Sequence, residues 1–135
     1  PAVPRPFRRS SVRDPLLALA ALLGASGVGL GAFGAHGLEA RLGEALATWE
    51  TGVFYHLVHA LALLAVALLL RVAGEAPLLR SAAWLFAAGV GLFSGSLYLL
   101  ALGGPGWLGP VTPLGGLAFI VGWVCIAAQG LRSAP

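Results

Sequence analysis

The chain has 135 residues, of which 59% are hydrophobic and only 10% are charged, and its net charge is +3. A soluble domain usually carries about 25% charged residues, because its surface has to face water. The composition therefore excludes an ordinary soluble domain and indicates one domain surrounded mostly by lipid. The basic residues are all arginines placed at the ends of apolar segments and in the tail. This placement is typical of a membrane topology signal, and we expect no nucleic-acid partner.

Four apolar runs follow a basic, proline-containing tail at residues 1–15. Each run has roughly the 20 residues that are needed to cross about 30 Å of hydrocarbon. They cover residues 16–38, 53–72, 79–102 and 114–131, and residues 132–135 follow as a short terminus. A cleaved signal peptide is the alternative for the first run, but the run extends too far past any plausible cleavage site. We predict an all-α, integral membrane four-helix bundle over residues 16–131.

Residues 39–52, between the first two runs, are less apolar than the runs themselves. Apolar side chains recur here at helical spacing, at Leu38, Leu42, Ala45, Leu46 and Trp49. The spacing predicts a short amphipathic helix in the outer membrane interface. The alternative is a simple polar connector that happens to be helical.

The arginines also predict the orientation of the chain. If the runs alternate in direction, one side receives Arg5, Arg8, Arg9, Arg13, Arg71, Arg80 and Arg132. Only Arg41 falls on the other side. Because basic residues are retained in the cytoplasm, both termini are predicted to be cytoplasmic.

Small residues at four-residue spacing predict close packing between helices in lipid. Glycines of this kind occur in three runs, at Gly27, Gly31 and Gly34, at Gly91 and Gly95, and at Gly122. We predict that the glycine face of the first run packs against the third run. The alternative to close packing is that the small residues line a pathway for a solute. The sequence Gly-Val-Gly-Leu at 27–30 recurs at 89–92, which raises the hypothesis of a duplicated helical hairpin.

Polar side chains inside apolar runs are costly in lipid and need partners within the protein. The candidates are His36, Tyr55, His56, His59, Ser94, Ser96 and Tyr98, with Glu50 just outside a run. At 1.5 Å per residue, the helices place these groups in the outer half of the membrane. We predict that His36, His59 and Ser94 converge, with Tyr98 or Glu50 as a further partner.

Three interpretations of this cluster are open. It is structural if its members only form hydrogen bonds between helices. It is a metal site if His56 and His59 act as ligands together with Glu50. It is a proton relay, or a contact to haem or quinone, if it works through His36 and His59.

The sequence favours a non-enzymatic protein without a catalytic residue, metal or cofactor. It contains no nucleophile–base pattern and no glycine-rich phosphate loop. We predict a structural or accessory subunit that contacts the lipid bilayer and packs into a homo-oligomer or a larger membrane complex. The alternatives are a small transporter or proton-coupled channel that uses the polar cluster, and a haem- or quinone-linked membrane component.

Several stretches together resemble a known family. They are GAFGAHGL at 31–38, ETGVFYHLVHALAL at 50–63, LFSGSLY at 92–98, and TPLGG at 112–116 followed by Gly122 and Trp123. In this order they resemble the family called domain of unknown function 423, small bacterial inner-membrane proteins similar to the eukaryotic transmembrane protein 256. The resemblance implies a four-helix protein of the bacterial inner membrane, and it implies no reaction or substrate. His56 stands where many bacterial members have Gln.

Overall fold

The computed structural model describes residues 1–2 and 13–132, and the regular structure within them is entirely helical. The helices are α1 (Pro15–Phe33), α2 (Glu39–Leu42), α3 (Leu46–Ala73), α4 (Pro77–Gly89), α5 (Gly95–Ala101) and α6 (Val111–Leu131). Two π-helical turns, η1 (Gly34–Leu38) and η3 (Val90–Ser94), and two 3-10 turns, η2 (Gly43–Ala45) and η4 (Gly106–Leu108), complete the order. The predicted all-α fold is confirmed. Arg5, Arg8 and Arg9 of the predicted tail, and residues 133–135, lie outside the described residues.

Local sequence sets where the long helices begin and end. Asp14 caps α1, because its Oδ1 accepts a hydrogen bond from the backbone N–H of Leu17 at 3.0 Å. Pro15 and Pro77 occupy the first turns of α1 and α4, where the missing N–H costs nothing. Gly74 ends α3 with a φ of +78°, a conformation that side chains with a Cβ rarely adopt.

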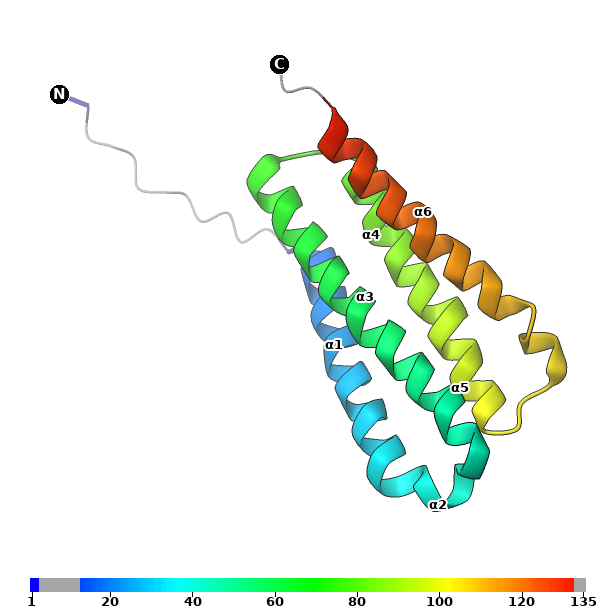
Figure 1. Cartoon of the computed structure of the whole chain (residues 1–135). Helices are drawn as coiled ribbons and strands as arrows, with labels where there is room; N and C mark the ends of the chain where they lie inside the picture. Colours follow the sequence, from blue (N-terminus) through cyan, green and yellow to red (C-terminus); the bar gives the residue numbers. More distant parts are fainter. Residues whose placement is uncertain (3–12, 133–135) are drawn as a thin grey trace.

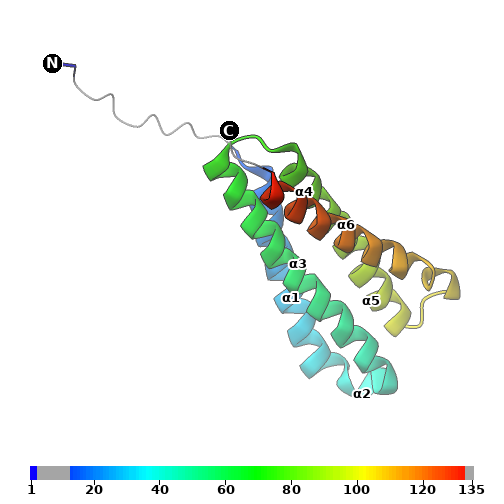
Figure 2. The ribbon, with the colours of Figure 1, turned by 45° about the horizontal axis from the view of Figure 1, so that its top comes forward.

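The helices form four arms that lie side by side in a row (Figures 1 and 2). The arms are α1 with η1, then α3, then the α4–η3–α5 segment, and finally α6. α1 packs on α3, α3 packs on the α4–η3–α5 arm, and α6 packs on that same arm. α1 and α6 therefore occupy the two ends of the row. Side chains of α6 also reach α3, where Phe119 and Trp123 contact His59. The start of α1 and the end of α6 lie at the same end of the molecule, opposite α2 (Figure 1).

Among the residues that the structure describes, three helical stretches are long and apolar enough to cross a membrane: Pro15–Ala73, Pro77–Ala101 and Gly106–Leu131. The first has 59 residues, about three times the length that a membrane requires. It folds back on itself at α2, so that α1 and α3 lie side by side (Figure 1). Gly43, with a φ of +53°, lies in this turn. The crossing of a membrane by all four arms stays a prediction.

The predicted interfacial helix over residues 39–52 does not form as a separate element. Its first part is α2, which has four residues, followed by the η2 turn. Its second part is the start of α3, so that Trp49 lies on a long helix and not on a connector. The apolar spacing nevertheless marks buried side chains, because Leu38, Leu42 and Trp49 form a small core at this end with Ala101.

The sequence predicted that the glycine face of the first run packs against the third run, and this prediction is wrong. The face packs against α3. A Cβ atom would meet Leu57 at Gly27, Val53 at Gly31, and Trp49 at Gly34. At Gly91 and Gly95 it would meet no atom within 4 Å, so these two glycines do not serve a close approach within the chain. Gly122 does, because a Cβ there would lie 2.6 Å from the ring of Phe86.

The two copies of the Gly-Val-Gly-Leu sequence have similar surroundings. The first glycine of the first copy, Gly27, packs against the following long helix, α3, at Leu57. The first glycine of the second copy, Gly89, packs against the following long helix, α6, at Phe119. In each hairpin, this glycine brings the first arm close to the second. The arrangement is compatible with a duplicated hairpin.

Candidate functional site

A hydrogen-bonded chain centred on His56 joins three arms of the row. His56 lies on α3 and is buried, with 4% of its surface exposed. Its Nδ1 lies 2.9 Å from the hydroxyl of Tyr98 on α5, and its Nε2 lies 3.2 Å from the hydroxyl of Ser26 on α1. Ser26 in turn donates to the carbonyl oxygen of Leu23 at 3.1 Å. The chain of contacts therefore crosses from α5 through α3 to α1.

The number of available donor hydrogens decides which group donates in each of these hydrogen bonds. The single hydroxyl hydrogen of Ser26 is used for the Leu23 carbonyl, so Ser26 accepts the hydrogen bond from Nε2–H of His56. A neutral imidazole with its hydrogen on Nε2 has an acceptor at Nδ1. Tyr98 then donates its hydroxyl hydrogen to that nitrogen. All three side chains are satisfied when His56 is neutral and carries its hydrogen on Nε2.

His59 makes a second junction, between α3 and α6, and is surrounded by aromatic rings. Its Nδ1 donates to the backbone carbonyl of Tyr55 at 2.8 Å, and its Nε2 accepts from the indole N–H of Trp123 at 3.1 Å. The imidazole stacks on Phe119 with ring centroids 3.5 Å apart, and Phe86 meets it edge-on at 5.4 Å. His59 thus requires its hydrogen on Nδ1, opposite to His56.

Two buried serines make further ties. Ser94 in η3 is fully buried and donates to the carbonyl of Gly52 on α3 at 2.7 Å. Ser96 on α5 donates to the carbonyl of Phe93 at 2.9 Å, within its own arm. Its hydroxyl oxygen also contacts the hydroxyl of Thr112 at the start of α6, which is then the donor. The serines therefore connect the third arm to both of its neighbours.

The remaining predicted members lie elsewhere. His36 and Glu50 are exposed, and Tyr55 is at the border of exposed, with 37% of its surface accessible. The predicted convergence of His36 with His59 and Ser94 is wrong for His36. It lies in the π-helical turn η1, where the wider backbone departs from the regular helix on which the prediction rested. His59 and Ser94 bond to separate carbonyls of α3, at Tyr55 and Gly52.

The histidine pair on α3 is not arranged as a metal site. His56 bonds toward α1 and α5, whereas His59 bonds toward α6. Glu50, the proposed carboxylate ligand, is exposed. Within residues 1–2 and 13–132, no three His, Cys, Asp or Glu side chains come together as a possible metal site.

Sequence reasoning missed three partners: Ser26, Thr112 and Trp123. The sequence contained a signal for Ser26 and another for Trp123. Ser26 is a polar residue within an apolar run. An unpartnered polar side chain costs free energy in lipid, and this cost applies to Ser26 as it does to the other candidates. Trp123 carries an indole N–H, a hydrogen-bond donor, within an apolar run. Thr112 precedes the predicted fourth run, so it was not among the polar side chains counted inside apolar runs.

The sequence matches the family described as "Protein of unknown function (DUF423)" over residues 30–116. A UPF0382 membrane protein of Bacillus subtilis is 48% identical over 106 residues, which cover 78% of this chain and 86% of that protein. Another, of Haemophilus influenzae, is 39% identical over 123 residues, covering 90% and 98%. A third, of Schizosaccharomyces pombe, is 40% identical over 115 residues, covering 78% and 92%.

No solved structure matches the chain. The family match covers more than half of the residues, and the relatives align over most of their own lengths. The relatives are named as membrane proteins, which agrees with the long apolar helices. The chain belongs to the DUF423, or UPF0382, family of membrane proteins, which has members in bacteria and in fission yeast.

Proposed function

We propose that this protein is a non-enzymatic, structural or accessory subunit of a homo-oligomer or a larger complex in the bacterial inner membrane. The observation that carries the proposal is the use of its buried polar groups. His56 ties α3 to α1 and α5, the pair of His59 and Trp123 ties α3 to α6, and Ser94 ties η3 to α3. Such bonds fix the relative placement of the helices, as a scaffold requires.

The helix lengths support an arrangement with four membrane crossings. α3 has 28 residues and α6 has 21, which correspond to about 42 Å and 32 Å at 1.5 Å per residue. Both lengths suffice for about 30 Å of hydrocarbon. With four crossings and the arginine distribution of the sequence, both termini lie in the cytoplasm.

The open row supports association with further subunits. α6 lies at one end of the row and buries only Gly115, Phe119 and Gly122. Most of its other large side chains are exposed, among them Leu114, Leu117, Ile120, Val121, Trp123 and Val124. In the membrane this surface is covered either by lipid or by another protein, and the subunit proposal requires protein on at least part of it.

The test of the subunit proposal is the state of the protein in its own membrane. A tagged chain, expressed at low level and cross-linked in intact cells, is extracted in mild detergent and weighed by native mass spectrometry. The expected result is a homo-oligomer or a complex with one defined membrane protein. A monomer without a cross-linked partner, seen at several detergent concentrations, would contradict the proposal.

The directed chain from Tyr98 through His56 to Ser26 favours a second candidate, a proton relay. His56→Gln separates the two candidates, because an amide oxygen accepts from Tyr98 and an amide N–H donates to Ser26. An amide does not bind a proton near neutral pH, so a relay is lost in this variant. Proton flux into vesicles that contain the purified protein measures the relay directly. We expect no flux in the wild type; flux that His56→Gln abolishes would establish the relay.

A further inference from the structure

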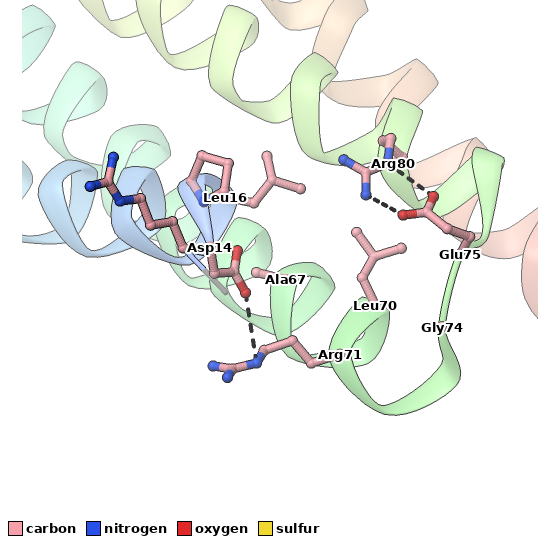
Figure 3. Close-up of a pocket in the computed structure, with 10 residues that line it drawn as sticks. Asp14, Leu16, Ala67, Leu70, Arg71, Gly74, Glu75 and Arg80 are labelled. Carbon is pink, nitrogen blue, oxygen red and sulfur yellow. Dashed lines mark hydrogen bonds and ion pairs between the residues drawn. The ribbon is translucent and has the colours of Figure 1, made fainter. Parts of the chain in front are cut away.

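A cavity of about 450 Å³ opens at the end of the molecule opposite α2. It lies where α1 begins, α3 ends and α4 begins (Figure 3). Leu16 of α1 and Leu70 of α3 project into the space between two ion pairs, that of Asp14 with Arg71 and that of Glu75 with Arg80 (Figure 3). The cavity thus has an apolar floor and a charged rim.

The rim carries more positive than negative charge. Its charged residues are the three arginines Arg13, Arg71 and Arg80 and the two carboxylates Asp14 and Glu75, which leaves a net charge of +1. The hydrogen bond from Arg80 and the charge of its guanidinium lower the pKa of the Glu75 carboxyl, so this pair stays ionised at neutral pH.

Arg71 is held less tightly than Arg80. Its Nε lies 3.7 Å from the Oδ2 atom of Asp14, which is longer than a hydrogen bond. The other carboxylate oxygen of Asp14 is already used to cap α1 at Leu17. More than half of the Arg71 side chain, 57%, is exposed to solvent. An anion that enters the cavity can therefore bind its terminal nitrogens without first breaking a short ion pair.

We propose that this cavity binds the phosphate headgroup of an anionic phospholipid. Three apolar helices begin or end at its walls, so it lies at the level where the hydrocarbon of a membrane meets water. The guanidinium groups of Arg71 and Arg80 match the oxygens of a phosphate diester. The floor of Leu16, Ala67 and Leu70 accepts the glycerol backbone and the first acyl carbons. Basic pockets between membrane helices bind anionic headgroups in this way. The site requires the membrane location but not the subunit role.

The experiment is native mass spectrometry of the full chain from mixed micelles that contain either phosphatidylglycerol or phosphatidylcholine with the same acyl chains. The variants are Arg71→Gln and Arg80→Gln. Arg41→Gln is the matched control, because it removes the same charge in α2, at the opposite end. Each arginine near a membrane surface contributes about a fivefold change in the binding of an anionic lipid. Thermal unfolding in the same detergent shows whether each variant is folded.

The proposal expects bound phosphatidylglycerol in the wild type and in Arg41→Gln, and about fivefold less in Arg71→Gln and in Arg80→Gln. Phosphatidylcholine should bind weakly to all of them. Equal binding of the two lipids would overturn the proposal, as would wild-type binding in both cavity variants, or an equal loss in Arg41→Gln. Displacement of the lipid by excess inorganic phosphate would also overturn it, because the ligand would then be free phosphate and not a headgroup.

Discussion

The imidazole ring of His59 lies flat on the ring of Phe119, with centroids 3.5 Å apart and planes inclined by 9°. One ring belongs to α3 and the other to α6, so the stack is a direct contact between two arms of the row. Both nitrogens of the imidazole are used at the same time, by the carbonyl of Tyr55 and the indole of Trp123. His59 is therefore fixed on one face and at both polar edges.

The two buried histidines should carry their hydrogen on different nitrogens. His56 is expected to be protonated on Nε2, because Ser26 accepts there and Tyr98 donates to Nδ1. His59 is expected to be protonated on Nδ1, because that nitrogen faces a carbonyl oxygen. Nitrogen-15 NMR of the imidazoles in detergent distinguishes the two forms, and His56→Gln and His59→Gln assign the signals.

His59 should stay neutral, because both of its nitrogens already have partners in the neutral form. A second proton on His59 would place an N–H against the indole N–H of Trp123. The same tautomer in His56 and His59, or a second proton on His59 at neutral pH, would show that the hydrogen-bond assignment is incorrect.

Gly115→Ala should destabilise the protein much more than Gly116→Ala. A Cβ at Gly115 would clash with the backbone of Phe93, which cannot move aside as a flexible side chain can. The expected loss in free energy of unfolding is about 1–3 kcal/mol, from overpacking. At Gly116 the nearest atoms lie at 3.7 Å, an ordinary contact, and alanine also favours the helix. Thermal unfolding in detergent compares the two neighbours; equal stability would place the α6 packing face elsewhere.

Gly31→Leu should disturb the packing of α1 on α3. A Cβ at this position lies 3.1 Å from Val53, and the rest of a leucine side chain has to displace it. We expect a loss of about 1–3 kcal/mol in the free energy of unfolding. Gly91→Leu is the control, because a Cβ at Gly91 meets no atom within 4 Å. If the two variants unfold alike in the monomer, α1 and α3 do not pack through this glycine.

Ser94→Ala should cost about 0.6–2 kcal/mol of unfolding free energy, the range for hydrogen bonds between membrane helices. The substitution removes the donor to the carbonyl of Gly52 and adds no volume. Ser81→Ala, an exposed serine in the same arm, provides the comparison. Equal unfolding of Ser94→Ala and Ser81→Ala in a chemical denaturation series would remove this bond from the interactions that hold η3 to α3.

A reporter enzyme that works only outside the cytoplasm should be inactive when it is fused to the C-terminus. The reason is the arginine distribution, which retains both ends of the chain in the cytoplasm. A fusion inserted at Gly43, in the turn between α1 and α3, should be active. Activity at the C-terminus, with none at the turn, would reverse the predicted orientation.

The sequence by itself determined the helices. Length and apolar composition are local properties, and they predicted runs that the structure shows as helical arms, with Pro15 and Pro77 at the first turns of α1 and α4. The cost of a polar group in lipid identified His59 and Ser94 as side chains that need partners, and both have them.

Only the tertiary structure decided which partners these groups have. α1 and α6 are apolar on all sides, so no contrast between a polar and an apolar face tells which side of either helix meets a neighbour. The glycine face of α1 could therefore be recognised as a packing face, yet its partner α3 could not. His36 shows a second limit, because the π-helical turn η1 changes the rotation of the backbone, and helical spacing does not reveal such a turn. The partners of the other side chains depend on how each helix is rotated about its own axis, and the contacts between arms set that rotation.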